Sequence, residues 1–313
     1  MLNTPIYKLD ENENKLYIKR DDLLPFSFGG NKARKAEKFF NEIDKGKYDS
    51  VVTYGSGSSN HGRIIANMAK ARDLECIIIS PEEASEETFN TEIMRYLGAK
   101  IIVTPASYVA KTIDDLLLEL NSKGRKPYFI QGGGHGNLGT QAYVDCYGEI
   151  KEYERKESIN FDYIFLASGT GATQAGLVCG QLINADNRSI VGISIARKNP
   201  RGRDVILNSI KEYLESEHLE IDPSKIEQKT IFTDEYICGG YGKFNLEIER
   251  VIETSYKKYG LPLDPTYTGK AFSGMLSYVK DKGLIGKNIL FIHTGGTPLY
   301  FDYLRGVSDV END

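Results

Sequence analysis

A lysine at the start of a helix-like segment is the residue in this sequence best suited to covalent chemistry. Lys32 follows two glycines in the run Phe28-Gly29-Gly30-Asn31-Lys32-Ala33-Arg34-Lys35. The helix dipole disfavours a cation at this end and Arg34 and Lys35 add like charge, so we expect a lowered pKa for the Lys32 ammonium. An amine with a lowered pKa can form an imine with a carbonyl compound. Taken alone, the motif favours another interpretation, a solvated helix face with Arg34, Lys35 and Lys38.

A turn rich in glycine and threonine could bind a phosphate group. Ser168-Gly169-Thr170-Gly171-Ala172-Thr173 follows the apolar run 163–167 and precedes a helix-like segment. Small residues let backbone N–H groups approach an anion, Thr170 and Thr173 add hydroxyl donors, and a helix N-terminus favours negative charge. The turn lacks the lysine of a Walker loop and the glycine spacing of a dinucleotide-binding motif. A strand-to-helix turn without a ligand would have the same composition, so both interpretations stay open here.

A second polar turn could receive a carboxylate or a phenolate oxygen. It follows Val51-Val52-Thr53-Tyr54 and reads Gly55-Ser56-Gly57-Ser58-Ser59-Asn60-His61-Gly62-Arg63. A serine-rich helix cap explains Ser59 or Asn60 equally well, but it explains less readily why the whole turn is small and polar. His61 by itself is more typical of a surface or capping residue than of a catalyst. Because the four histidines show no metal-ligand spacing, we expect no metal.

Strand-like and helix-like segments alternate along the chain, and they must position these turns. β-Branched or aromatic runs lie at residues 49–54, 76–80, 101–104, 127–130, 163–167, 190–195 and 288–293. Helical periodicity lies at residues 32–43, 62–71, 89–97, 110–121, 140–151, 173–183 and 245–258. This alternation predicts an α/β fold with largely parallel sheets, in which ligands bind beyond the carboxyl ends of the strands.

Composition excludes several classes of function. The 313 residues are 40% hydrophobic and 27% charged, which suffices for a substantial core and two domains. The net charge of -5 and the dispersed basic residues predict no nucleic-acid partner and no membrane partner. The four cysteines are far apart and form no CxxC pair, which favours reduced thiols and a cytoplasmic protein. No targeting segment or transmembrane run is expected.

Seven motifs together resemble the 1-aminocyclopropane-1-carboxylate deaminase and D-cysteine desulfhydrase family of fold-type-II pyridoxal-phosphate enzymes. Three of them are the lysine motif Gly-Gly-Asn-Lys-x-x-Lys, the Ser59-Asn60 turn and the Thr170-to-Thr173 loop. The further matches are Ile18-Lys19-Arg20-Asp21-Asp22, Gly132-Gly133-Gly134 with Leu138-Gly139, Asp264-Pro265-Thr266-Tyr267-Thr268-Gly269-Lys270, and His293-Thr294-Gly295-Gly296-Thr297-Pro298. The resemblance runs along nearly the whole chain, and the motifs stand in family order.

The resemblance implies a cofactor, pyridoxal 5'-phosphate, and an architecture. The expected fold is a two-domain, three-layer αβα arrangement with mostly parallel sheets. Residues 1–45 and 156–313 would form a large cofactor-binding domain and residues 46–155 a small domain. The charged stretch 151–157 is the best candidate for the crossing between them, although a solvated helix end would look the same. A homodimer is also implied.

The resemblance further implies a role for each matched residue. Lys32 would be the Schiff-base lysine and proton shuttle, and Asn60 would contact the 3-hydroxyl group of the cofactor. The remaining cofactor-binding residues would be Thr170, Gly171, Ala172 and Thr173 at the phosphate, together with Thr268 and Thr294. Catalytic roles would fall to Lys32, Ser59, Tyr267 and Tyr241, and the substrate, a small amino acid, would contact Ser58, Ser59, Asn60, His61, Tyr241 and Tyr267.

Two threonines favour elimination over ring opening. In this family the deaminase typically has glutamate after the tyrosine matching Tyr267 and leucine after the histidine matching His293, where this chain has Thr268 and Thr294. A carboxylate beside the pyridine nitrogen would keep that nitrogen protonated and strengthen the electron sink, whereas a threonine hydroxyl supplies no charge. We therefore expect β-elimination from D-cysteine, giving pyruvate, ammonia and hydrogen sulfide.

Two departures from the family pattern keep the substrate open. Gly57-Ser58 replaces a common Ile-Gln, and Gly134-His135-Gly136 replaces a Gly-Gly-Ser-like segment. The alternatives are a lyase or deaminase for another small amino acid, such as 1-aminocyclopropane-1-carboxylate, cysteate, diaminopropionate or serine. A rival from another class is a protein that binds the cofactor or a nucleotide phosphate without turnover. Intact Lys32, Asn60 and Tyr267 count against this rival, because binding alone needs no imine-forming lysine.

Overall fold

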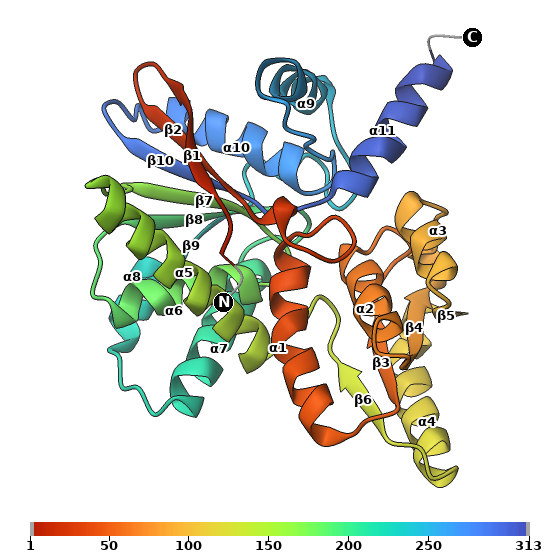
Figure 1. Ribbon diagram of the computed structural model, residues 1–313. Coiled ribbons are helices and arrows are strands. Elements are labelled where there is room, and N and C mark those ends of the chain that lie inside the picture. The colour runs from red at the N-terminus through yellow and green to blue at the C-terminus, as the bar shows by residue number, and fades with distance from the viewer. Residues whose placement is uncertain (1–2, 311–313) are drawn as a thin grey trace.

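The computed structural model describes residues 3–310, which form two β-sheets covered by helices (Figure 1). The larger sheet has six strands in the order β1-β2-β10-β7-β8-β9, and the smaller has four in the order β5-β4-β3-β6. The pairings are parallel except that of β1 with β2. Burial of both faces explains why most strands are continuous apolar runs. The predicted α/β fold with mostly parallel sheets is confirmed.

The larger sheet contains the first and last strands of the chain. Its strands are β1 (Ile6–Glu11), β2 (Lys15–Arg20), β7 (Tyr163–Ser168), β8 (Ser189–Ser194), β9 (Ile231–Thr233) and β10 (Asn288–His293). One face packs on α5 (Asn137–Glu157), α6 (Ala172–Ile183), α7 (Arg201–Ser216) and α8 (Pro223–Lys229), and the other on α9 (Leu246–Tyr259) and α10 (Thr268–Asp281). Successive β7 residues alternate between the two cores: Ile164 and Leu166 face one, and Phe165 and Ala167 face the other.

The smaller sheet also has helices on both faces. Its strands are β3 (Ser50–Tyr54), β4 (Glu75–Pro81), β5 (Lys100–Thr104) and β6 (Pro127–Ile130). One face packs on α1 (Asn31–Gly46), α2 (Asn60–Lys70) and α3 (Phe89–Tyr96), and the other on α4 (Val109–Ser122). Helix α1 contacts both α2 and α5, so it lies between the two sheets (Figure 1). The helix that begins beside Lys32 is therefore held by both halves of the molecule.

The remaining elements are short helices and the last helix of the chain. Three 3-10 turns span Asp21–Leu23, Glu82–Ala84 and Ala106–Tyr108, and α11 (Thr297–Val310) extends away from the body of the molecule (Figure 1). The Asp302 carboxylate on α11 accepts hydrogen bonds at 3.0 and 3.2 Å from the Phe89 backbone N–H. This contact satisfies the first N–H group of α3, whose N-cap is Thr88, and connects the last helix to the helices of the smaller sheet.

All seven strands predicted from the sequence are present, with ends that shift by at most one residue. The predictions omitted β1, β2 and β9. The charged stretch 151–157 forms the last turns of α5, as the alternative interpretation anticipated. The chain passes from β6 of the smaller sheet directly into α5, which packs on the larger. The division into residues 1–45 with 156–313 and residues 46–155 stays a prediction.

Candidate active site

A cavity of about 550 Å³ lies where the carboxyl ends of both sheets meet the start of α1. Loops after β3, β6, β7, β8 and β10 line it, as expected for a ligand site in parallel α/β sheets. The lining brings together ten of the predicted site residues: Lys32, Ser59, Asn60, His61, Thr170, Gly171, Thr173, Tyr241, Tyr267 and Thr294. The other three, Ser58, Ala172 and Thr268, lie outside this lining.

Lys32 projects from the first turn of α1 into the cavity. Its Nζ donates a hydrogen bond of 3.0 Å to the Gly133 carbonyl oxygen. Burial lowers the pKa of Lys32 to about 8. The direction of this shift agrees with the prediction, and its cause in the folded protein is the loss of water around the buried ammonium, which was not among the causes predicted from the sequence. The amine is thus substantially neutral near pH 8, as imine formation requires.

The segment before Lys32 has an unusual backbone. Phe26, Ser27 and Phe28 have φ angles of 72°, 42° and 63°, and the following Gly29 and Gly30 are also left-handed. Non-glycine residues rarely adopt this region, and three in succession indicate a local backbone held by its surroundings. At Gly30 a Cβ atom would lie only 2.7 Å from the Thr294 carbonyl oxygen. The glycine pair thus lets the lysine turn lie directly against the loop after β10.

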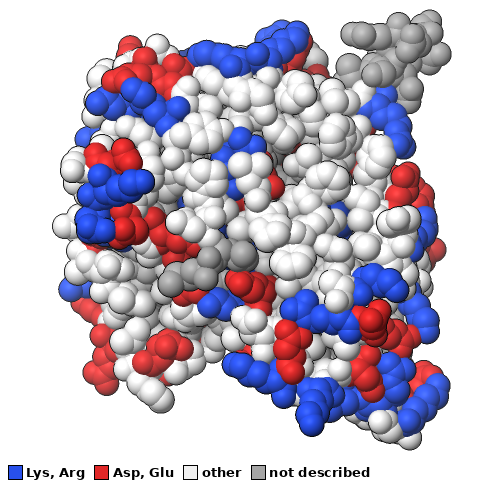
Figure 2. All heavy atoms as spheres, viewed as in Figure 1, with Lys and Arg blue, Asp and Glu red and all other residues white. Residues whose placement is uncertain are grey.

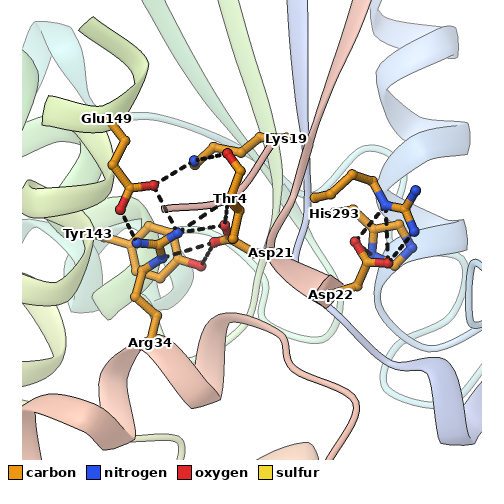
Figure 3. A network of polar contacts seen from close by, with 9 residues as sticks. Thr4, Lys19, Asp21, Asp22, Arg34, Tyr143, Glu149 and His293 are labelled. Atoms are coloured by element: carbon orange, nitrogen blue, oxygen red, sulfur yellow. Dashed lines mark hydrogen bonds and ion pairs between the residues drawn. The ribbon is translucent and has the colours of Figure 1, made fainter. Parts of the chain in front are cut away.

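A buried ionic network fixes the other side of this turn (Figure 3). Arg34 pairs with Asp21 at 2.8 Å and with Glu149 at 2.5 Å, and Lys19 pairs with Glu149 at 2.7 Å. The Asp21 carbonyl oxygen accepts a hydrogen bond of 2.8 Å from the Gly30 N–H. Arg34 is therefore directed away from Lys32, which explains why the two residues do not share a basic helix face. The motif Lys19-Arg20-Asp21-Asp22 serves this scaffold.

Gly133 brings the lysine and the threonine-rich turn together. Its φ is 72°, and an added Cβ would lie 2.7 Å from the Thr170 methyl carbon and 3.3 Å from Lys32 Nζ. Asn31 Nδ2 also donates a hydrogen bond of 3.0 Å to Thr173 Oγ1. Two motifs separated by more than a hundred residues therefore face each other across the cavity.

The threonine-rich turn has the geometry of an anion site. Gly171, with a φ of 100°, is the N-cap of α6, and Thr170, Gly171 and Thr173 line the cavity at this helix start. Unpaired N–H groups at a helix start, with hydroxyl donors beside them, suit a phosphate. The Ala172 side chain is a methyl group without a hydrogen-bond donor, so this residue could contact a phosphate through its backbone N–H only. These residues fit the phosphate end of pyridoxal phosphate.

The serine-rich turn begins α2 and contributes polar groups from the smaller sheet. Ser59 is the N-cap, since its Oγ accepts a hydrogen bond of 3.1 Å from the Gly62 N–H. Within the described part of the chain its hydroxyl group donates to no acceptor, so its proton can be donated to a ligand. Gly57 cannot carry a side chain, because a Cβ would lie 2.1 Å from the Glu86 carbonyl oxygen. The family commonly has isoleucine at the position of Gly57. In this chain the segment before α3 occupies the space that such a side chain would need.

His61 is buried and its tautomer can be deduced. Thr53 Oγ1 donates to the Ile130 carbonyl oxygen at 2.7 Å and so accepts from His61 Nε2 at 2.9 Å. His61 Nδ1 is then an acceptor, and in the part of the chain that the structure describes it has no partner. Burial, together with the charges of Lys32 and Lys35, lowers the pKa of His61 well below its usual value. The imidazole is thus a neutral group rather than an acid.

Two tyrosines connect the serine-rich turn to the larger sheet. The hydroxyl groups of Tyr241 and Tyr267 are 2.6 Å apart, and the Tyr241 hydroxyl lies 3.1 Å from Ser58 Oγ and 3.4 Å from Ser56 Oγ. Burial raises the pKa of Tyr267 well above its usual value. Ser58 lines a neighbouring cavity that also includes Tyr241. A chain of hydroxyl groups therefore crosses the mouth of the site.

The structure separates the two threonines that distinguish this chain from the family deaminases. Thr294 lines the cavity, whereas Thr268 is fully buried outside it. Thr268 Oγ1 donates to the Asp264 carboxylate at 2.8 Å and accepts from the Asp264 N–H at 2.9 Å. Its hydroxyl group therefore stabilises the start of α10, and Thr294 is the better placed of the two to meet a ligand.

Several residues at the site were not assigned from the sequence. Lys35 is fully buried one turn after Lys32, and its Nζ lies 3.5 Å from the same Gly133 oxygen. Its spacing on the helix was the available signal. Arg197 lines the cavity and donates to the Gly169 carbonyl oxygen at 3.1 Å. Lys270 donates to the Gly240 carbonyl oxygen at 2.6 Å and holds the loop that carries Tyr241.

The charged side chains that line the cavity are basic. Its lining includes Lys32 and Arg197, and none of the described lining residues is aspartate or glutamate. On the face drawn in Figure 2, by contrast, side chains of both signs are interspersed. The site therefore suits an anionic cofactor and a substrate carboxylate. Among the described residues, no group of histidine, cysteine and carboxylate side chains could hold a metal, and no helix is long and apolar enough to span a membrane.

A lysine at a helix start, facing a glycine-rich anion turn between two parallel α/β sheets, defines the fold-type-II class of pyridoxal-phosphate enzymes. The family model described as "Pyridoxal-phosphate dependent enzyme" matches residues 1–295. The chain therefore belongs to this family, and within it to the 1-aminocyclopropane-1-carboxylate deaminase and D-cysteine desulfhydrase family. The expected cofactor and enzyme class are confirmed.

The relatives carry two names. A protein of Pyrococcus abyssi, provisionally named a 1-aminocyclopropane-1-carboxylate deaminase, is 33% identical over 306 residues, covering 96% of this chain and 91% of that protein. The D-cysteine desulfhydrase of Serratia proteamaculans is 31% identical over 314 residues, covering 96% and 93%. A crystal structure described as an "ACC deaminase homologue" has a TM-score of 0.87 and 34% identity, covering 98% of this chain and 93% of that one. The names of these relatives therefore refer to two different substrates, 1-aminocyclopropane-1-carboxylate and D-cysteine.

Proposed function

We propose that this enzyme is a D-cysteine desulfhydrase-like lyase, which removes sulfide from D-cysteine by β-elimination and releases pyruvate and ammonia. The observation that carries the proposal is the absence of any carboxylate among the described residues lining the cavity. Ring opening in this family is associated with a glutamate after the active-site tyrosine, and Thr268 stands there. Elimination of a good leaving group such as sulfide can proceed with a weaker electron sink than opening of the cyclopropane ring.

The residues of this chain can perform the proton transfers. When bound, pyridoxal phosphate would supply an electron sink for the bond-breaking at the α-carbon. Lys32, with a pKa of about 8, can accept the α-proton as a free amine and return it as an ammonium. The Ser59 hydroxyl proton and the backbone N–H groups of the serine-rich turn can bind the substrate carboxylate. Tyr241 and Tyr267 lie opposite that turn, where a substrate side chain would point.

Product analysis tests this proposal. Purified holoenzyme is incubated with D-cysteine, L-cysteine, D-serine and 1-aminocyclopropane-1-carboxylate, and sulfide, pyruvate, 2-oxobutyrate and ammonia are measured. We expect equal amounts of sulfide and pyruvate from D-cysteine and no 2-oxobutyrate from the cyclopropane. Lys32→Ala should lose the visible absorption band and turnover while keeping its circular dichroism spectrum. Release of 2-oxobutyrate without sulfide would contradict the proposal.

A second candidate is elimination from an amino acid whose β-substituent is anionic, such as cysteate. Arg197 and His135 lie in the cavity lining, and burial lowers the pKa of Arg197, as expected for a guanidinium without a carboxylate partner. An anionic substituent would supply that partner. The measurement is sulfite release from cysteate under the same conditions, with Arg197→Met as the variant expected to lose it.

We further propose that the chain acts as a homodimer in the cytoplasm, as the family resemblance implies, and that it has the two domains predicted from the sequence. Free thiols support the compartment: all four cysteines are unpaired, and burial raises the pKa of the Cys76, Cys146 and Cys179 thiols to about 12. Light scattering during size-exclusion chromatography measures the mass of the assembly. A mass of one chain would contradict the dimer.

A further inference from the structure

Arg63 is a fully buried guanidinium that lacks a carboxylate partner. It lies in the first turn of α2 with an exposed fraction of 0%. Nη2 donates a hydrogen bond of 3.2 Å to Asn60 Oδ1, while Nε and Nη1 have no partner among the described residues. The Phe28 ring lies beside it, with its centroid 6.0 Å from Cζ. Burial lowers the pKa of Arg63 to about 9.

Other buried arginines show how unusual this arrangement is. Arg34 and Arg188 are both 3–4% exposed at their side chains, and each pairs with carboxylates at 2.8 Å or less. A buried charge is normally paired in this way, because its desolvation is otherwise uncompensated. Among the described residues, Arg63 donates to one amide oxygen, that of Asn60, and pairs with no carboxylate. Its compensation must therefore come from something that binds nearby.

The contact with Arg63 determines how the amide of Asn60 is oriented. A guanidinium can only donate hydrogen bonds, so the Asn60 atom that faces it is the oxygen. Asn90 Nδ2 donates to the same oxygen at 3.0 Å and to the Ser58 carbonyl oxygen at 3.0 Å. Asn60 Oδ1 is thus held by two donors on the protein side. The Asn60 side chain lines the cavity, and no described residue accepts a hydrogen bond from its Nδ2.

We propose that Arg63, together with Asn90, is a positioning residue that turns the Asn60 N–H donor toward the 3-oxygen of the bound cofactor and keeps that oxygen ionised. The proposal rests on the role assigned above to Asn60 as the partner of this oxygen. The positive charge of Arg63 polarises the amide through its carbonyl oxygen, which strengthens the donor on the opposite side. The ionised oxygen in turn supplies the negative charge that Arg63 lacks.

The test follows the proton affinity of the lysine-bound cofactor. Its visible absorption band changes with pH, and the midpoint of that change reports how well the ionised oxygen is stabilised. The holoenzyme is compared with Arg63→Met, Asn60→Ala and the double variant. We expect each single change to raise the midpoint by about one pH unit or more, a tenfold change in proton affinity. The double variant should match Asn60→Ala, because Arg63 acts through Asn60.

Two further variants make the result decisive. Arg188→Met removes another buried arginine, which pairs with Glu154, does not line the cavity and should leave the midpoint unchanged. If Arg63→Met does not fold, Asn90→Leu provides a second test, because it removes the other donor to Asn60 Oδ1. It should raise the midpoint by about half a pH unit, which is a threefold change in proton affinity. An unchanged midpoint in a folded Arg63→Met or Asn90→Leu variant overturns the proposal.

Other outcomes are equally informative. Additive shifts in the double variant would mean that the charge acts independently of Asn60, and would overturn the positioning role. An unchanged midpoint in Asn60→Ala would remove the assignment on which the proposal rests. None of these measurements uses an amino-acid substrate, so failure of the desulfhydrase proposal would leave them unaffected.

Discussion

Replacing Lys32 with methionine is expected to change how the stability of the cofactor-free protein depends on pH. Burial lowers the pKa of Lys32 from 10.5 to about 8 in the folded state, while the unfolded chain keeps the ordinary value. The folded state binds this proton less tightly, so the site destabilises the protein fully below about pH 8. Stability is then regained as the pH rises toward 10.5. At 1.36 kcal/mol per pKa unit, the full effect is on the order of 3 kcal/mol.

Urea unfolding of both proteins at about pH 6.5 and about pH 9.5 measures this effect. Lys32→Met has no charge to bury, so its advantage in free energy of unfolding should fall by about 2 kcal/mol between the two pH values. Lys45→Met is the control, because the Lys45 side chain is 78% exposed. The free energy of unfolding of Lys45→Met should differ from that of the unaltered protein by the same amount at both pH values. A constant advantage for Lys32→Met would refute the lowered pKa of Lys32 in the folded protein.

Three further predictions concern the walls of the site. Ser58→Gln, which restores the common family residue, removes a 3.1 Å contact with Tyr241 and should raise the KM for D-cysteine about fivefold with little change in kcat. Gly133→Ala should weaken cofactor binding at least about tenfold in a spectral titration, whereas Gly136→Ala, also left-handed but with open space around it, should not. Asp302→Ala removes the acceptor of the Phe89 N–H in the first turn of α3 and should lower the free energy of unfolding by about 1 kcal/mol, while Asp302→Asn should lower it less.

The sequence predicts the parallel core well, because buried strands and amphipathic helices carry strong local patterns. All seven predicted strands are present. Two of the three omitted strands lack such a pattern: β1 lies at a sheet edge with polar residues on both faces, and β9 has only three residues. The two polar turns were located correctly for the same local reason, since each directly follows a strong strand signal.

The side-chain partners at the site depend on contacts between distant segments, which local patterns do not reveal. Arg34 looked like a neighbour that would repel Lys32, yet Glu149, 115 positions away, draws it to the opposite side of α1. Thr268 and Thr294 looked equivalent in the sequence, but Asp264 holds the Thr268 hydroxyl inside the protein. For Arg34 the deciding carboxylate is distant in the sequence, whereas for Thr268 it lies four residues earlier, just before α10.

The basic groups around the cavity explain why the site favours an anionic cofactor. Lys32 and Arg197 line the cavity, Lys35 and Arg63 are buried beside its loops, and no described lining residue is a carboxylate. Burial lowers the pKa of all four groups, so each is held in the folded protein at an electrostatic disadvantage. The fold therefore holds these positive charges at an electrostatic cost, which an anionic phosphate and phenolate would offset. Cofactor affinity then comes partly from the scaffold, since residues that never touch the cofactor contribute to binding it.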